Sequence, residues 1–329
     1  MSLPPHPVVF CFAGQGSQYF RMGADLMESE PLFRQWMQAG DDRIRRSMGF
    51  SLLDRLYGPQ AVPGQPFDQL EASHPAIFLV QYTLAKVMAG HGIRPDLLLG
   101  VSLGEFTAQA VAGMVSFATA LDAVCQQPAL FFRTCPPGGM IAVLASPELH
   151  AASPTLAAKS ELAGINSDTH FVLAALHADL PEIEDELRRH DVPFQRLPVP
   201  FAFHSRFVAP AEQTWRETFG GLRRDTPFWP VWSACDCGPI GPADAELGWR
   251  IVRQGMKVQE TIAKLESQGG AVYVDLSPSG TLAALLRQCL PPGSTSRLLS
   301  VLSPFGGDRE RLRKTLSVLR PLAPTATPP

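Results

Sequence analysis

Short apolar runs that end in glycine or serine predict buried β-strands along this chain. Residues Val8–Phe12 form such a run and are followed by the glycine-rich turn Ala13–Gln18. A second run, Asp96–Val101, leads directly to Ser102, and the next residues, Leu103–Ala112, include good helix formers at helical spacing. The pattern therefore predicts a strand, a sharp turn and a helix around Ser102.

From Met140 onward the pattern changes to short segments that alternate between strand and helix character. The predicted elements are strands at Met140–Leu144, Leu162–Asn166, His170–Ala175 and Val192–Leu197, and an amphipathic helix at Leu180–His190. Outside this stretch, Pro75–Val87 has helical spacing and Ala271–Leu276 has the pattern of another buried strand. The alternation predicts a small α+β module inserted into a larger α/β domain.

These patterns predict the domain boundaries. Residues 1–138 and 204–320 are assigned to the large α/β domain, and residues 139–203 to the small inserted domain. The last residues, 321–329, are rich in Pro and Thr, which predicts a disordered tail.

Composition and charge exclude several classes of function. The net charge of −3 and the absence of a Lys/Arg block provide no basic surface for nucleic acid. No apolar run reaches the roughly 18 to 20 residues that cross a bilayer. The six cysteines are widely spread and the chain start lacks a secretory pattern, so we expect a cytoplasmic protein. The spacing of Cys235-Asp236-Cys237 does not suit a zinc site, and no metal is expected.

The segment Gly100-Val101-Ser102-Leu103-Gly104 fits the pattern G-x-S-x-G. Small residues on both sides of such a serine let the chain turn sharply and expose the hydroxyl at the start of a helix. The same turn points free backbone N–H groups at an oxyanion that forms on an attacked carbonyl, and the N–H of Leu103 is the expected donor. Ser102 is therefore a candidate nucleophile, although the five-residue pattern alone also occurs by chance in coils.

A serine nucleophile needs a base, and neutral imidazole is the usual one near pH 7. Among the eight histidines, His204 ends the apolar run Val199–Phe203, where the inserted module is expected to return to the large domain. Residues that line clefts gather at such junctions. The alternative is a structural histidine that is satisfied by backbone groups in a buried loop.

Three blocks together resemble the malonyl-CoA:acyl-carrier-protein transacylase superfamily. They are Phe12–Gln18, Gly100–Glu105 and Phe203-His204-Ser205, and the resemblance extends from Val8 to Leu319. It implies an α/β-hydrolase-like large domain with an inserted ferredoxin-like α+β domain. It also implies that Ser102 is acylated, that His204 is its base, and that the backbone N–H groups of Gln15 and Leu103 form the oxyanion hole.

The family usually orients its histidine through a backbone carbonyl rather than an acidic side chain. Asp275, which follows a predicted strand, is therefore not assigned to a catalytic triad. No metal or organic cofactor is implied, because the phosphopantetheine arm belongs to the substrate.

Several positions depart from the family pattern. Malonyl-selective members carry an Arg that pairs with the malonyl carboxylate, and Gln127 stands at that position here. Arg133 lies further along the same predicted helix, and Pro128 is expected to break that helix, so Arg133 is not expected to replace the missing guanidinium. At position 74 this chain has His where the family usually has Gln. At position 101, directly before the nucleophile, it has Val where the family usually has His. The residues assigned to the acyl pocket are Gln127, His74, Val101 and Phe203.

The amino-acid sequences of these blocks are most similar to those of stand-alone enzymes of trans-acyltransferase polyketide synthase clusters. The branch of that group that lacks the Arg removes acyl groups such as acetyl from acyl carrier proteins. Gln127 therefore favours an editing acyl hydrolase, and acyl transfer from CoA or a carrier protein is the alternative. Both use the same acyl-enzyme, so the sequence leaves the final acceptor open. A non-catalytic homologue is expected to lack Ser102 or His204, and both are present.

The expected partners are acyl carrier proteins, and the expected substrates are acyl-pantetheine or acyl-CoA thioesters. Carrier proteins are typically acidic, so a locally basic docking surface is expected. Arg206, Arg253 and Lys257 are candidates for it, and ordinary solvated charges are the alternative reading of the same residues.

Overall fold

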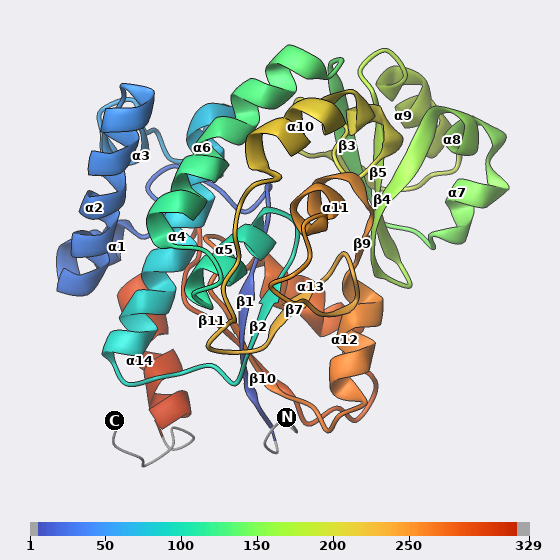
Figure 1. Ribbon diagram of the computed structural model, residues 1–329. Coiled ribbons are helices and arrows are strands. Elements are labelled where there is room, and N and C mark those ends of the chain that lie inside the picture. The colour runs from blue at the N-terminus through green and yellow to red at the C-terminus, as the bar shows by residue number, and fades with distance from the viewer. Residues whose placement is uncertain (1–5, 321–329) are drawn as a thin grey trace.

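A computed structural model describes residues 6–320 and arranges them around two β-sheets (Figure 1). The predicted tail 321–329 lies outside the described residues. The larger sheet has the order β11-β10-β1-β2-β7-β8, in which β8 pairs antiparallel to β7 and all the other pairs are parallel. Its strands are β1 (Val8–Phe12), β2 (Leu97–Gly100), β7 (Val231–Ser233), β8 (Gly238–Pro239), β10 (Val272–Asp275) and β11 (Arg297–Ser300).

Helices cover both faces of the larger sheet, so its central strands are apolar on both sides. The alternating side chains of β1 show this, because Val8, Phe10 and Phe12 join one apolar cluster whereas Val9 and Cys11 join another. The helices of this domain are α1 (Ala24–Ser29), α2 (Pro31–Met48), α3 (Leu52–Tyr57), α4 (Leu70–Gly90), α5 (Leu103–Val111), α6 (Phe117–Thr134), the 3-10 helix η1 (Arg206–Ala211), α10 (Glu212–Phe219), α11 (Leu247–Arg253), α12 (Val258–Glu266), α13 (Thr281–Cys289) and α14 (Asp308–Leu319).

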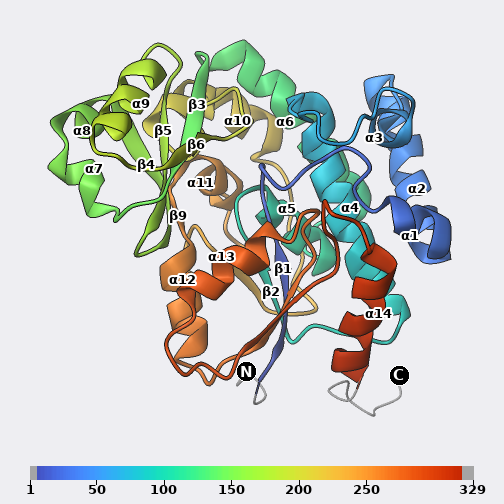
Figure 2. The ribbon, with the colours of Figure 1, turned by 180° about the vertical axis from the view of Figure 1, so that it is seen from behind.

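The two apolar clusters correspond to the two helical layers. Helices α2, α4, α5, α6 and α14 contribute to the first cluster, and α12 and α13 contribute to the second. Figure 2 shows α12 and α13 on one side of the central strands and α4 and α14 on the other side. The carboxyl ends of β1 and β2, where parallel sheets usually bind ligands, are followed by the turn at Gly14 and by Ser102.

The smaller sheet has the order β6-β3-β5-β4-β9, in which every pair is antiparallel except β4 with β9. Its strands are β3 (Gly138–Val143), β4 (Ser160–Ser167), β5 (His170–Leu176), β6 (Phe194–Arg196) and β9 (Met256–Lys257), and its helices are α7 (Glu148–Ala152), α8 (Pro154–Lys159) and α9 (Leu180–Arg189). Side chains of β3 and β5 pack against α8 and α9 in an apolar cluster of their own. Helix and strand packing of this kind is the expected ferredoxin-like α+β module.

Strand β9 comes from the part of the chain after residue 204, which the sequence analysis assigned to the large domain. Gly164 and Ile165 of β4 pair with Met256 and Lys257, so a later segment completes the edge of the small sheet. A two-residue strand carries no run of alternating residues by which a sequence pattern could identify it. The segment that follows α11 therefore connects the two sheets.

Helix α6 differs from the prediction, because it continues through Pro128 to Thr134. The expectation that Pro128 breaks the helix was wrong. A proline in a helix removes one backbone hydrogen bond, but packing can offset this cost, and Val124, Gln127 and Phe131 around it are buried. No helix within residues 6–320 is both long and apolar enough to cross a membrane.

Candidate active site

Ser102 occupies a strained turn between β2 and α5, with φ 55° and ψ −126°. Positive φ is uncommon for residues other than glycine. A Cβ atom on Gly100 would lie 2.4 Å from Cα of Glu105, and one on Gly104 would lie 2.0 Å from the carbonyl oxygen of Phe12. Both glycines are therefore required for the close packing of α5 on β1 and β2, and this packing holds Ser102 at the amino end of the helix.

His204 lies beside Ser102, with 2.8 Å between Ser102 Oγ and His204 Nε2. Its other ring nitrogen, Nδ1, is 3.0 Å from the carbonyl oxygen of Gln254. A carbonyl can only accept, so Nδ1 carries the proton and Nε2 is free to accept from the serine hydroxyl. His204 is only 3% exposed, and burial lowers its pKa to about 4. The imidazole is therefore neutral near pH 7 and able to take a proton.

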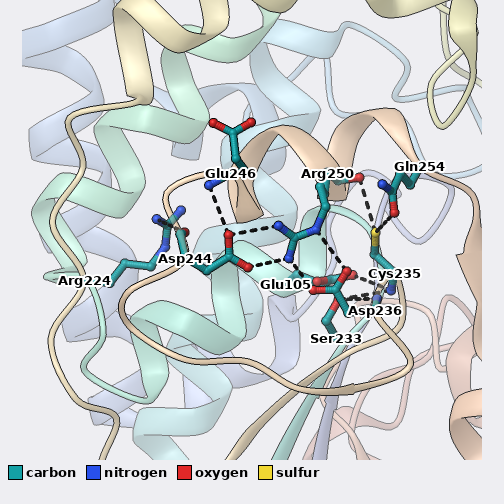
Figure 3. Close-up of polar contacts among 9 residues, drawn as sticks. All are labelled: Glu105, Arg224, Ser233, Cys235, Asp236, Asp244, Glu246, Arg250 and Gln254. Carbon is teal, nitrogen blue, oxygen red and sulfur yellow. Dashed lines mark hydrogen bonds and ion pairs between the residues drawn. The ribbon is translucent and has the colours of Figure 1, made fainter.

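A polar network holds the segment that positions His204 (Figure 3). The backbone N–H of His204 donates to Val252 O at 2.8 Å. Helix α11 therefore holds the backbone of His204, and Gln254, directly after α11, holds its imidazole. Arg250 of α11 donates to the carboxylates of Asp236 and Asp244. These two ion pairs attach α11 to the turn between β7 and β8 and to the segment that follows β8.

The same network reaches the helix behind Ser102. Glu105 of α5 is 1% exposed, and its Oε1 accepts from the backbone N–H of Cys235 at 3.2 Å. Cys235 Sγ in turn donates to Arg250 O at 3.3 Å. Burial raises the pKa of Glu105 to about 8. The elements behind the serine and the histidine are thus connected through one buried set of contacts.

The backbone of the glycine-rich turn after β1 lies directly against the serine. A Cβ atom on Gly14 would lie 3.0 Å from Ser102 Oγ and 3.3 Å from the backbone nitrogen of Leu103. Within residues 6–320, the N–H groups of Gln15 and Leu103 make no hydrogen bond to a protein acceptor, whereas Gly104 N donates to Val101 O. Free backbone N–H groups next to a serine nucleophile can bind an oxyanion.

A cleft of about 470 Å³ contains Ser102 and His204 between the two domains. Its walls include Met140, His170 and Gln195 from the small sheet and its connections. Among the described residues that line it, there is no Lys, Arg, Asp or Glu. The cleft therefore offers no fixed charge to a bound group.

The four residues assigned to the acyl pocket from the sequence all line this cleft: Gln127, His74, Val101 and Phe203. Gln127 is 2% exposed, and its Nε2 has no hydrogen-bond partner within residues 6–320. His74 Nδ1 contacts the amide Nε2 of Gln15, and burial lowers the pKa of His74 to about 3. Both side chains are thus neutral polar groups in the wall.

Other residues that the sequence singled out lie elsewhere. Arg133 is exposed on α6 and is not part of the cleft wall. Arg206 and Arg253 both pair with Glu161, at 3.2 Å each. Asp275 accepts from the backbone N–H groups of Ser277 and of Ala283, which is in the first turn of α13. These hydrogen bonds give Asp275 a structural role. No cluster of three or more potential metal ligands occurs within residues 6–320.

The sequence did not indicate the importance of Gln254, Phe106 or Phe131. The carbonyl of Gln254 orients His204, while Phe106 and Phe131 line the cleft. A main-chain carbonyl belongs to every residue type, so nothing in the residue letters marks it. Phe106 lies four residues after Ser102 on α5, and the helical spacing of that segment is the one signal that could have placed it near the nucleophile.

Comparison with known proteins identifies the family of this chain. Residues 9–320 match the family model described as the acyl transferase domain. The chain is 39% identical over 308 residues to the polyketide biosynthesis acyltransferase homolog BaeD of Bacillus velezensis, covering 94% of this chain and 95% of that protein. It is 40% identical over 325 residues to the polyketide biosynthesis protein ThaF of Burkholderia thailandensis, covering 96% of this chain and 28% of that longer protein.

Solved structures show the same fold. The acyltransferase domain of SpnD, in complex with 2-(pent-4-yn-1-yl)malonyl, is 26% identical and superposes with a TM-score of 0.87, covering 98% of this chain and 78% of that one. The FabD protein of Acinetobacter baumannii is 24% identical with a TM-score of 0.82, covering 97% of this chain and all (100%) of that one. The large α/β domain with its ferredoxin-like insertion, predicted from the resemblance, is confirmed.

Proposed function

The chain belongs to the acyl transferase domain family, and from this premise we propose that it hydrolyses acyl thioesters on acyl carrier proteins through an ester on Ser102. The 2.8 Å contact between Ser102 Oγ and His204 Nε2 supports the first half of the reaction. The uncharged wall of the cleft supports the choice of a neutral acyl group.

In the first step, Ser102 Oγ attacks the thioester carbonyl while His204 Nε2 takes the hydroxyl proton. The N–H groups of Gln15 and Leu103 stabilise the negative charge that develops on the carbonyl oxygen, and one such donor contributes about 3 kcal/mol. The carbon–sulfur bond then breaks, the proton on His204 passes to the leaving thiolate, and the acyl group remains as an ester on Ser102.

In the second step, water attacks the ester while His204 takes one of its protons. The same two N–H groups bind the oxyanion, the ester bond to Ser102 breaks, and His204 returns the proton to Ser102 Oγ. The products are the free carboxylic acid and the unchanged enzyme. No metal or organic cofactor takes part in either step of this proposal.

The absence of Lys and Arg from the described cleft wall is the observation that carries the choice of substrate. A malonyl group would bring a carboxylate into this cleft, and a buried charge without a partner costs several kcal/mol. Gln127 is a neutral amide at the position where the malonyl-selective members of the resembled family have Arg. Acetyl and other neutral acyl groups are therefore the proposed substrates.

We further propose acyl carrier proteins of a polyketide pathway as the partners, since the named relatives belong to polyketide biosynthesis. The substrate then brings its own phosphopantetheine arm, and the reaction takes place in the cytoplasm. Arg206 and Arg253 are each paired with Glu161, whereas Lys257 makes no ion pair within residues 6–320. Lys257 is accordingly the first residue to test for carrier-protein docking.

Acyl transfer is the second candidate function. The family description and the name of the 39% identical relative both specify an acyltransferase. Transfer uses the same ester on Ser102, and a second pantetheine thiol replaces water as the acceptor. The two functions differ only in the acceptor that reaches the ester.

The deciding experiment is mass spectrometry of acetyl- and malonyl-loaded acyl carrier protein incubated with the enzyme, with and without an unloaded second carrier protein. Hydrolysis predicts free acetate, a preference for acetyl over malonyl and no acyl group on the second carrier. Efficient movement of malonyl to the second carrier would contradict both the hydrolase and the interpretation of Gln127. The Ser102→Ala variant provides the control without a nucleophile.

A further inference from the structure

A second, smaller cavity lies directly behind the cleft. Phe106 of α5 and Gln127 of α6 line both cavities, so these two side chains form the boundary between them. The volume of the second cavity is about 110 Å³. Nothing in the reaction proposed above uses this space.

The walls of the second cavity are largely apolar and come mainly from four helices, α5, α6, α10 and α11. They include Ala120 and Ala123 of α6, Trp215 and Phe219 of α10, and Trp249 of α11. An apolar cavity of about 150 Å³ in a protein core is known to bind benzene, so 110 Å³ has room for about four carbon atoms. The space therefore suits a short stretch of hydrocarbon.

Apart from Gln127, the polar side chains that line the second cavity are bonded within the protein. Arg224 donates through Nε to Gln109 Oε1 at 2.8 Å and through Nη1 to Asp244 O at 3.2 Å. Arg216 and Glu246 form an exposed ion pair at the outer rim. A chain that entered from the cleft would pass Phe106 and Gln127 and then contact the apolar side chains of the second cavity.

Gln127 is the exception at the boundary between the two cavities. Its Nε2 is buried and has no hydrogen-bond partner within residues 6–320. A buried donor without a partner is unfavourable by about 1 to 3 kcal/mol, and native proteins keep few of them. Other buried side-chain atoms, such as Thr83 Oγ1 and Thr107 Oγ1, are also unpaired within the described residues, and a hydrocarbon cannot accept from Gln127 Nε2. The case for a ligand therefore depends on the apolar walls of the second cavity and on its position behind the cleft.

We propose that the second cavity binds the distal part of a linear, neutral acyl chain whose carbonyl is esterified to Ser102. The chain runs along the cleft, passes between Phe106 and Gln127, and places its last four or so carbons among Trp215, Phe219 and Trp249. The substrate class is therefore medium-length acyl thioesters in addition to acetyl. This inference rests on the proposed ester on Ser102.

The first test compares acetyl-, butanoyl-, hexanoyl- and octanoyl-pantetheine as substrates of the wild-type enzyme and of an Ala123→Leu variant. Ala123 is 7% exposed and lines only the second cavity, so a leucine there fills it. We expect the ratio of kcat/KM for octanoyl over acetyl to fall at least tenfold. The matched control is Ala129→Leu, on the exposed face of the same helix, which is expected to keep the wild-type ratio.

A second measurement reports occupancy without catalysis. Trp215 and Trp249 line the second cavity, whereas the other three tryptophans, at positions 36, 229 and 232, line neither cavity. In the Ser102→Ala variant, octanoyl-pantetheine is expected to change the tryptophan emission and acetyl-pantetheine is not. Adding Ala123→Leu to that variant is expected to remove the change.

The results separate this inference from the proposed function. If none of the four thioesters acylates Ser102, the proposed function fails, and the emission measurement still decides whether the cavity binds a chain. If Ser102 is acylated but the octanoyl-to-acetyl ratio stays within threefold of wild type in Ala123→Leu, the second cavity is not an acyl site. An octanoyl-dependent emission change that persists when Ala123→Leu is added to Ser102→Ala would also overturn the proposed acyl site.

Discussion

The imidazole of His204 is oriented by the main chain, through a 3.0 Å hydrogen bond from Nδ1 to the carbonyl oxygen of Gln254. An acidic side chain has this role in the serine triads. A carbonyl fixes the tautomer equally well, because it can only accept. It adds no negative charge that would raise the pKa of the buried imidazole.

The first prediction separates the Gln254 carbonyl from its side chain. Gln254→Ala keeps the carbonyl, so we expect kcat/KM for acetyl-pantetheine to fall less than about tenfold. His204→Ala removes the base and is expected to lower kcat by about 10³-fold or more. A loss in Gln254→Ala as large as that in His204→Ala would show that the side chain, not the carbonyl, is the important partner.

The second prediction concerns the pH dependence of the reaction. Burial lowers the pKa of His204 to about 4, so the neutral, basic form dominates above that pH and is lost as the pH falls through it. We expect kcat/KM to vary less than about twofold between pH 5.5 and 8, provided that circular dichroism shows the same fold throughout. A half-maximal rate at pH 6.5 or above would contradict the assignment of His204, with its lowered pKa, as the base.

The third prediction tests the neutral wall of the cleft. Gln127→Arg introduces a guanidinium that can pair with a malonyl carboxylate through two parallel hydrogen bonds. We expect the ratio of malonyl to acetyl loading on Ser102, measured by mass spectrometry of the intact protein, to rise at least tenfold. Gln127→Met has a similar size without charge and should leave malonyl disfavoured; a rise in this variant too would exclude the electrostatic explanation.

The fourth prediction concerns stability and Glu105. Burial raises its pKa to about 8, while the unfolded chain ionises it near pH 4.5. Between these values the folded state holds a proton that the unfolded state has released, so this residue lowers stability as the pH rises.

Glu105→Gln should remove that decline. In urea unfolding, we expect the variant to gain about 1 kcal/mol or more relative to wild type between pH 5.5 and 8.5. Glu71→Gln, at an exposed position on α4, is the control and should show no such gain. An equal pH dependence in wild type and Glu105→Gln would mean that Glu105 is ionised in the folded protein.

The fifth prediction concerns the glycine after the nucleophile. A Cβ atom on Gly104 would lie 2.0 Å from Phe12 O, and neither backbone can move without displacing β1 or α5. We expect Gly104→Ala to destabilise the protein by about 3 kcal/mol or more, measured by urea unfolding. Gly221→Ala has nothing within 4 Å of the added atom and is expected to change stability by less than about 1 kcal/mol.

Much of the local architecture was predictable because it depends on residues that are neighbours in sequence. Strand β1 has the predicted bounds, and the strand, turn and helix around Ser102 differ from prediction by one residue at the ends. The antiparallel strands and α9 of the small domain also occur near their predicted positions. Helix α6 was misjudged at Pro128, since the burial of its neighbours is not a local property. The domain boundaries remain a prediction.

The sequence by itself determined the family, the strand–turn–helix that exposes Ser102, and four residues of the cleft wall, Gln127, His74, Val101 and Phe203. Only the tertiary structure decided that the partner of His204 is the Gln254 carbonyl, that the described cleft wall carries no charged side chain, and that Phe106 and Gln127 separate it from a second cavity. The physical reason is that periodicity and turn chemistry act over a few residues. Cavities and main-chain contacts instead arise where segments distant in sequence pack together, as they do between residues 102, 204 and 254.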